Sequence, residues 1–478
     1  MADPAELTEL SATELRAALG AREISAVEAV SAHLERIDRG AAVNAMITVD
    51  AAGALRRAAQ LDADGPDPRL PLFGLPVGIK DTHDTGGIRT TYGSIRHAEH
   101  VPERDALHVR RMRDAGAIVI GKTNVPEYAA GSHSVNRVFG ATRNPYALDR
   151  SAGGSSGGAA AALAARQVAL ADGSDMGGSL RNPASFCNVV GLRPSPGVVP
   201  EAEASNLLTP LTTAGPMGRT VGDVALLLSV LGAPDARTPV AAPALGPVSA
   251  VADLRGLRVA WAPSLGGHAP IAADVDEVLS SAAAVLAEHG AHVETACPDL
   301  SGAADAFLTL RAAEFEIAWG AELDAHPDDF NERLTWNIRQ GRSLMGRDIM
   351  RAQERQTALM RGAARFFEQF DVLLAPAATV APFPVEWDYP RTVEGEPQAH
   401  YLDWMRAATT ITMLGAPALS VPAGFTRDGL PVGLQMVGPF GSDHRLLGIA
   451  QAYEALTGFA RLSPELPAES RHWSNEAR

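Results

Sequence analysis

Two segments rich in glycine and serine carry the residue types needed for nucleophilic chemistry. SAGGSSGGAA (151–160) has four glycines and three serines in its first eight residues, and an alanine-rich helical pattern follows it. DGSDMGGSLRNPASFC (172–187) contains a second such turn, Gly177-Gly178-Ser179, in an otherwise apolar region. Glycine leaves room for a substrate to approach the backbone, and a serine hydroxyl can attack a carbonyl carbon. The two turns therefore indicate a site where backbone and hydroxyl groups meet a carbonyl substrate.

The second turn also offers hydrogen-bond donors. Consecutive backbone N–H groups of Met176, Gly177 and Gly178 can form an oxyanion hole, because such groups stabilise the charge that develops on a carbonyl oxygen under attack.

A serine nucleophile needs a base, and the pattern favours Lys80. This residue ends the apolar run LPVGIK, so a strand would carry it into a partly desolvated site. Burial disfavours the ammonium form and leaves an amine able to accept a proton. Asp81 follows directly, but alternation along the strand turns its side chain away. The histidines in polar or helical contexts belong to no motif: His83, His97, His100, His108 and His133.

The first turn also fits a different type of site. Gly153-Gly154-Ser155-Ser156-Gly157 matches the nucleophile elbow G-x-S-x-G, which would make Ser155 the nucleophile of a Ser-His-Asp hydrolase. The phosphate-binding signatures G-x-x-x-x-G-K-[ST] and G-x-G-x-x-G after a strand do not occur here. From these residues alone, a Ser-Lys site and a Ser-His-Asp site both stay open.

Composition narrows the class of protein. The 478 residues carry a net charge of −15, which disfavours sequence-independent binding to nucleic acid or to an anionic membrane. No apolar run approaches the roughly 20 residues of a membrane span. The two cysteines, Cys187 and Cys297, cannot form a disulfide framework for a protein of this size. This favours a reducing compartment, so we expect a cytoplasmic location. No Cys/His cluster has zinc spacing, and we expect no metal and no cofactor.

The expected elements give an α/β fold. Residues 1–65 read as an N-terminal helical layer that opens with the capping boxes SATE and SAVE. From GLPVGIKD onward, short β-branched runs alternate with helical patterns, which predicts a large, mixed, mostly parallel twisted β-sheet with helices on both faces. We expect one domain over 1–478, in which a helical insertion at about 303–370 covers the site. Residues 66–235 would form the catalytic core, and 371–460 would return to the sheet.

Several segments resemble the amidase signature family in their order along the chain, from about residue 20 to residue 460. They are GLPVGIKD, AIVIGKTNVPEYAAGS, FGATRNPY, AGGSSGGAAAA, GSDMGGSLRNPASFCNVVGLRPS, TAGPMGRTVGDVALLL and PALSVPAGFTRDGLPVGLQMVGP. Ser155 and Ser179 also lie 24 positions apart, as the two serines of the family do.

The resemblance implies a fold, an activity and a set of roles. Ser179 would be the nucleophile, Ser155 the bridging serine after a cis peptide bond, and Lys80 the terminal base. Ala129 and Gly131 would line the acyl side with backbone. The family hydrolyses carboxamides through a serine acyl-enzyme and releases a carboxylic acid with ammonia or an amine, without metal or cofactor. Esters and carbamates suit the same machinery, and the expected partner is a small amide substrate.

Other functions remain open at this point. The chain could be the amidase subunit of a tRNA-dependent amidotransferase, although RPSPGVVPEAEASNLLTPLTTAGPM and YLDWMRAATTITMLGAPALSVPAG look more like free-standing amidases. It could also be a binding protein on the same fold, or a homodimer. The identity of the amide is not fixed by these patterns.

The expected supporting residues are of two kinds. Asp175 and Arg181 bracket the second turn and would form an internal ion pair, and Cys187 would be a buried small hydrophobe. Four large side chains would lie in the core or over the site: Trp336, Met345, Trp404 and Met405.

Overall fold

The computed structural model describes residues 4–204, 206–207, 211–238, 246, 248 and 253–466. The stretch RPSPGVVPEAEASNLLTPLTTAGPM, which looks like free-standing amidases in sequence, therefore lies partly outside the described residues.

Within the described residues, eleven strands form one sheet in the order β1-β3-β2-β8-β10-β9-β16-β17-β13-β11-β12. Their bounds are β1 Met46–Val49, β2 Pro76–Lys80, β3 Ile118–Thr123, β8 Leu170–Asp175, β9 Val190–Arg193, β10 Thr213–Gly218, β11 Arg258–Trp261, β12 His292–Thr295, β13 Val372–Pro376, β16 Ala418–Phe425 and β17 Pro431–Val437. Three short ribbons stand apart from it: β4 Val135–Asn136 with β5 Gly140–Ala141, β6 Arg143–Asn144 with β7 Ala147–Ser151, and β14 Thr392–Val393 with β15 Glu396–Pro397.

The sheet is large and mixed, as the sequence predicts, but it is not mostly parallel. Parallel pairing is confined, among the described strands, to β3-β2-β8 and to β12-β11-β13. The central run from β8 through β10, β9, β16 and β17 to β13 is antiparallel, and so is the β1-β3 pair. The central strands are buried on both faces, so their sequences lack the alternation of polar and apolar residues that is typical of an antiparallel strand with one solvated face.

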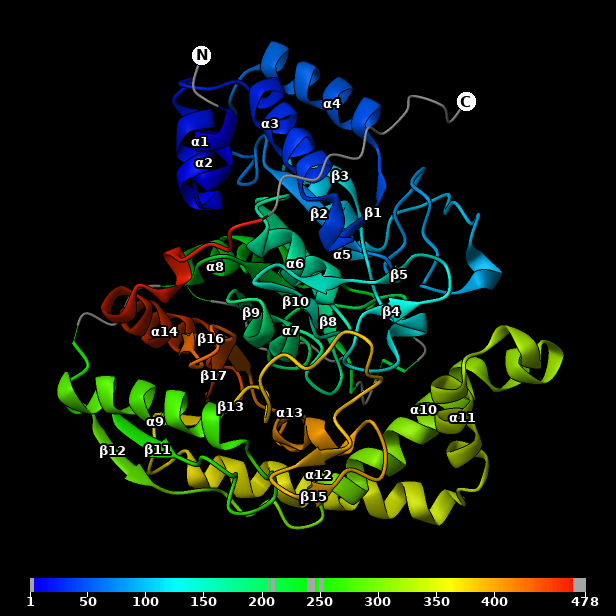
Figure 1. The fold of residues 1–478 in the computed structure, drawn as a ribbon, viewed down its shortest axis with the longest axis vertical. Helices are drawn as coiled ribbons and strands as arrows, with labels where there is room; N and C mark the ends of the chain where they lie inside the picture. The colour runs from blue at the N-terminus through cyan, green and yellow to red at the C-terminus, as the bar shows by residue number, and fades with distance from the viewer. Residues whose placement is uncertain are drawn as a thin grey trace.

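Helices cover both faces of the sheet (Figure 1). The N-terminal helices are α1 Pro4–Glu9, α2 Ala12–Gly20, α3 Ala26–Arg39 and α4 Ala51–Asp64. Those between and after the strands are α5 Leu107–Asp114, α6 Gly157–Ala164, α7 Arg181–Phe186, α8 Val221–Leu231, α9 Ala273–Glu288, α13 Arg406–Thr412 and α14 Asp443–Thr457. None of the described helices is long and apolar enough to cross a membrane.

The first helices begin where the sequence predicts. Ser11 and Ser25 each accept a hydrogen bond from the amide of the third helical residue, Glu14 and Glu28, whose carboxylates bond back to the capping amide. These two capping boxes fix the N-terminal ends of α2 and α3.

The segment 303–370 contains the long helices α10 Ala303–Ala325, α11 Glu332–Arg342 and α12 Gly346–Phe366. They lie at the opposite end of the molecule from α1–α4 (Figure 1). Phe307 and Arg311 on α10 face the turn that contains Ser179, since a Cβ on Gly177 would lie 2.9 Å from Phe307 Cζ and Arg311 donates to the Met176 sulfur.

Candidate active site

Lys80 is the last residue of β2, between the parallel strands β3 and β8, and its side chain is fully buried. Its Nζ donates to Ser155 Oγ at 2.7 Å and to Ser174 Oγ at 2.9 Å. The strand thus brings a buried amine into direct contact with the first serine turn. Asp81 accepts instead from Thr91, as alternation along the strand predicts.

The first serine turn connects β7 to α6. The Gly154–Ser155 peptide bond is cis, and the Gly154 carbonyl accepts a hydrogen bond from Ser132 Oγ at 2.7 Å. Gly158, in the first turn of α6, allows the helix to pack against the end of β3, because a Cβ there would lie 2.1 Å from the Asn124 nitrogen. The small residues of this segment therefore permit close backbone packing that fixes where Ser155 points.

Ser179 lies in the turn between β8 and α7, and 7% of its surface is exposed. The Ser156 amide donates to the Ser179 carbonyl at 3.2 Å, which joins the two serine turns. Ser179 Oγ makes no hydrogen bond to the described part of the chain, so it is free to meet a substrate.

The amides of this turn are not equivalent. The Gly178 N–H donates to Asp175 Oδ1 at 2.8 Å, so this predicted oxyanion donor is engaged within the protein. No hydrogen bond within the described residues uses the Met176 or Gly177 amide, and these two remain available to an oxyanion. Gly178 has a positive φ of 110° and its amide points toward the Asp175 carboxylate, which residue types alone do not reveal.

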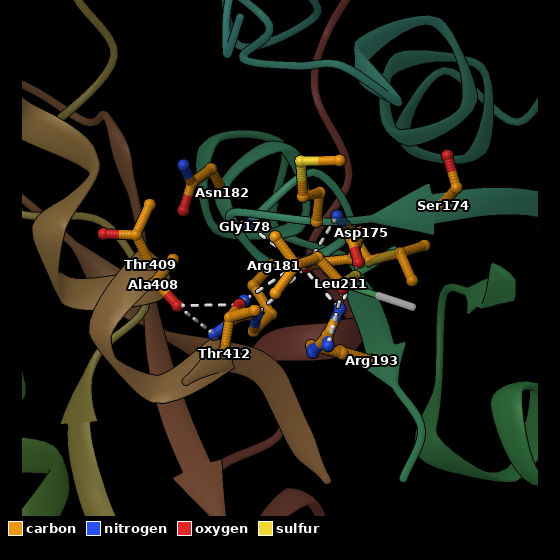
Figure 2. A network of polar contacts seen from close by, with 12 residues as sticks. Ser174, Asp175, Gly178, Arg181, Asn182, Arg193, Leu211, Ala408, Thr409 and Thr412 are labelled. Atoms are coloured by element: carbon orange, nitrogen blue, oxygen red, sulfur yellow. Dashed lines mark hydrogen bonds and ion pairs between the residues drawn. The ribbon is translucent and has the colours of Figure 1, made fainter. Parts of the chain in front are cut away.

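Asp175 forms the expected ion pair with Arg181 and anchors the turn (Figure 2). Arg181 Nε and Nη2 donate to the two Asp175 oxygens at 3.0 and 2.9 Å, and both side chains are fully buried. Burial raises the pKa of the Asp175 carboxyl, but Arg181 and Arg193 outweigh burial and hold it well below its usual range. The turn is therefore stiffened by a permanently charged pair.

Arg181 also connects the turn to distant parts of the chain. It donates to Gln435 Oε1 on β17 at 2.6 Å, to the Ala408 carbonyl at 3.0 Å and to Thr412 Oγ1 on α13 at 3.0 Å. These contacts hold α13 over the Ser179 turn.

Burial lowers the pKa of the Lys80 amine to about 7, although nearby carboxylates oppose this shift. The carboxylates that raise it are those of Asp172, Asp175 and Glu201. A lysine with this pKa is neutral in a large fraction of molecules at neutral pH, so it can accept a proton.

A polar cluster behind Lys80 was not predicted from the sequence. Asp172 Oδ1 accepts the Lys80 backbone amide at 2.7 Å, while Oδ2 lies 2.6 Å from His83 Nδ1 and 3.0 Å from His108 Nε2. Burial raises the pKa of the Asp172 carboxyl, but its bonds to the histidines outweigh burial and hold it well below its usual value. A buried carboxylate is thus fixed beside the lysine. Ser174, two residues after Asp172 on the same face of β8, accepts from Lys80 Nζ and was also not predicted from the sequence.

The histidines near the site do not serve either serine. Burial lowers the pKa values of His83 and His133 to about 4. His133 Nδ1 lies 2.7 Å from Ser151 Oγ, and no histidine in the described ranges bonds to Ser155 or Ser179. The Ser-His-Asp arrangement is therefore not favoured.

Ala129 and Gly131 both adopt positive φ values, 58° and 121°, in the segment after β3. The neighbouring Ala130 carbonyl accepts from Arg333 Nη1 of α11 at 3.0 Å. Of the large side chains considered from sequence, Met345 is 58% exposed, Trp404 and Met405 are buried, and Trp336 lines a cavity beside this segment. Cys187 is fully buried, and burial raises the pKa of its thiol, as expected for a core residue.

Comparison with known proteins places this arrangement in a family. The amidase family model matches residues 28–447. The chain belongs to the amidase family. It is an amide-hydrolysing enzyme, and the family resemblance of its sequence motifs is confirmed.

Its relatives in the amidase family include both an acylamidase and an amidotransferase subunit. An acylamidase of Rhodococcus erythropolis is 34% identical over 95% of this chain and 97% of its own length. A glutamyl-tRNA(Gln) amidotransferase subunit of Roseiflexus sp. (strain RS-1) is also 34% identical, over 97% of this chain and 99% of its own. The crystal structure of a bacterial aryl acylamidase superposes with a TM-score of 0.88 at 28% identity, covering 95% of this chain and 97% of the other. Similarity alone therefore does not separate a free-standing amidase from an amidotransferase component.

Proposed function

We propose that this protein is a free-standing amidase that hydrolyses a carboxamide through an acyl-enzyme on Ser179, with Ser155 and Lys80 as the proton relay. The 2.7 Å contact between Lys80 Nζ and Ser155 Oγ carries the proposal, because it couples a buried amine of lowered pKa to a serine hydroxyl. The products are a carboxylic acid and ammonia or an amine.

The proposed reaction has two halves. In the first, neutral Lys80 takes the Ser155 proton as Ser155 takes that of Ser179, and Ser179 Oγ attacks the amide carbon. The relay then returns the proton to the leaving nitrogen as the C–N bond breaks. In the second, a water molecule gives its proton to the same relay and attacks the ester carbon. The relay returns this proton to Ser179 Oγ as the ester C–O bond breaks, which releases the acid and restores the serine.

The Met176 and Gly177 amides would hold the oxyanion that forms in each half of the reaction. Gly178 then acts indirectly: its bond to Asp175 keeps the turn in the shape that presents the two preceding amides. Ala129 and Gly131 would line the acyl side with backbone.

The pH dependence of the purified chain, assayed without any partner, tests this proposal. On 4-nitroacetanilide we expect kcat/KM to rise with pH through about 7 and to stay level above it, because the amine must be neutral to accept a proton. This limb lies well below the ordinary pKa of a lysine, because burial lowers the pKa of the Lys80 amine to about 7. His83 or His133 acting as the base would place the limb near 4 instead. Such a limb would contradict the lysine base, and a chain inactive without partners would favour the amidotransferase role.

Asp172→Asn should move that limb to lower pH. The Asp172 carboxylate stabilises the Lys80 ammonium, so its removal lowers the pKa of the amine further, by about one pH unit. The asparagine oxygen can still accept the Lys80 amide, and its NH₂ group can donate to both histidines as neutral acceptors. The measurement is the pH profile of kcat/KM. Asp371→Asn is the control that should leave the limb in place, because this carboxylate pairs with Arg258 on β11, which six strands of the sheet separate from β2. An unmoved or raised limb in Asp172→Asn would refute the role of the carboxylate.

A further inference from the structure

A cavity of about 610 Å³ lies next to the segment proposed to line the acyl side. Arg333 belongs to its lining and donates to the Ala130 carbonyl, one residue from Gly131. Tyr401 also belongs to the lining, and its hydroxyl accepts from Arg311, which in turn contacts Met176 of the proposed oxyanion turn. Two side chains of the lining are therefore connected to the candidate active site, Arg333 directly through the Ala130 carbonyl and Tyr401 through Arg311.

The lining of the cavity has one more arginine than carboxylates, whereas the protein as a whole carries −15. Its lining includes three arginines against two carboxylates: Arg137, Arg333 and Arg391 against Glu332 and Asp388. Arg333 pairs with Asp388, and Arg137 lies 3.6 Å from a carboxylate outside the lining. Arg391 has no carboxylate within 4.0 Å among the described residues and lies over the Tyr389 ring, 4.0 Å from its centroid.

A second arginine without a paired carboxylate, Arg311, lies behind the lining of the cavity. Arg311 is 5% exposed, and no described carboxylate comes within 4.0 Å of its guanidinium. Its contacts are neutral: Tyr401 Oη at 2.8 Å, Met176 Sδ at 2.9 Å and Asn337 Oδ1 at 3.2 Å. Glu314, on the same helix, does not supply a firm counter-charge, since burial raises its pKa to about 7. A buried cation without a counter-ion is costly, so a bound anion would relieve it.

The Tyr401 hydroxyl can connect this charge to a ligand. It accepts from Arg311 Nη2 and, at 2.7 Å, from Asn337 Nδ2, which occupies both oxygen lone pairs. Its own proton has no acceptor among the described residues, although the side chain is only 4% exposed. A buried donor polarised by a guanidinium, on the wall of a cavity, is suited to a carboxylate oxygen.

We propose that this cavity binds a carboxylate carried by the amide substrate, so that the enzyme prefers acidic amides. Tyr401 and Arg391 would hold the carboxylate. Arg311, which donates to the Tyr401 oxygen, would make the Tyr401 O–H group a stronger donor. This inference rests on the proposed function for its substrate class.

Matched substrates test the preference on both sides of the scissile bond. N-(4-nitrophenyl)succinamic acid is compared with N-(4-nitrophenyl)butyramide, and 4-acetamidobenzoate with acetanilide. We expect kcat/KM to be at least about tenfold higher for the acid of one pair, because a charged hydrogen bond contributes that much. Tyr401→Phe and Arg391→Gln should each reduce the preference severalfold, measured as the ratio of kcat/KM between the acid and its neutral partner. Arg427→Gln, at an exposed arginine paired with Glu277, should change neither.

Direct binding separates this inference from the proposed function. Calorimetry on the Ser179→Ala protein, which needs no turnover, should give a Kd at least about tenfold lower for the acid than for its neutral partner in the same pair. Equal affinity within both pairs overturns the carboxylate site, whether or not the enzyme is active. Neutral anilides hydrolysed without any preference for acids would overturn it too and would leave the amidase proposal standing.

Discussion

Ser179→Ala is expected to lower kcat on an anilide by at least about 10⁴-fold and to leave no acyl-enzyme, because no other described group is placed to attack the carbonyl. The fold should be retained. Ser179 Oγ makes no hydrogen bond to the described residues, so its removal should change the free energy of unfolding by no more than about 0.5 kcal/mol.

Labelling with a fluorophosphonate, followed by intact mass and peptide mapping, checks this expectation. The native protein should carry one adduct, on Ser179, and Ser179→Ala should carry none. Ser155→Ala is the matched control: it should still be labelled on Ser179, but slowly, because the relay is broken. An adduct on Ser155 in the Ser179→Ala protein would reverse the two assignments and restore the Ser-His-Asp hypothesis.

Lys80→Met should be about as damaging as Ser179→Ala, because residues of one relay act as a unit and their effects do not add. Methionine fills nearly the same apolar volume and removes only the amine. The release of 4-nitroaniline in single-turnover experiments should disappear, since acylation itself needs the base. The double variant Lys80→Met/Ser179→Ala should lose little more than either single one.

Lys122 offers a matched control for this change. It is the other fully buried lysine of the sheet, on the neighbouring strand, and its Nζ bonds to the hydroxyls of Thr85 and Thr90 rather than to a serine of the site. Lys122→Met should lower the unfolding temperature but keep kcat of the folded protein within about tenfold. A Lys80→Met protein with kcat in that same range would exclude lysine as the base.

Much of this site could be predicted because its chemistry is local. Lys80, Ser155 and Ser179 each stand in a short motif whose composition has a physical purpose: a strand end that buries an amine, and turns whose small residues let backbones approach. The structure accordingly brings the Lys80 amine and the Ser155 hydroxyl together. Their roles in catalysis remain predictions that the experiments above address.

What sequence reasoning missed depends on contacts between distant segments. Asp172, His83 and His108 come from β8, the loop after β2, and α5, and nothing in any one of these segments indicates that they meet. The Gly178 amide was assigned to an oxyanion because its residue type allows it, whereas its direction is set by the Asp175 carboxylate. Strand direction was misjudged for a related reason, since a strand buried on both faces has the same apolar pattern in either orientation.

The reach of Arg181 has a consequence for how the enzyme is made. Its guanidinium is buried in the Ser179 turn, yet one of its acceptors is Gln435, synthesised some 250 residues later. A nascent chain that has not yet emerged to this point holds a buried cation without its full set of partners and lacks the strand that positions α13. The serine turn should therefore reach its working shape only after Gln435 has left the ribosome, so that a shorter nascent chain does not yet cleave amides.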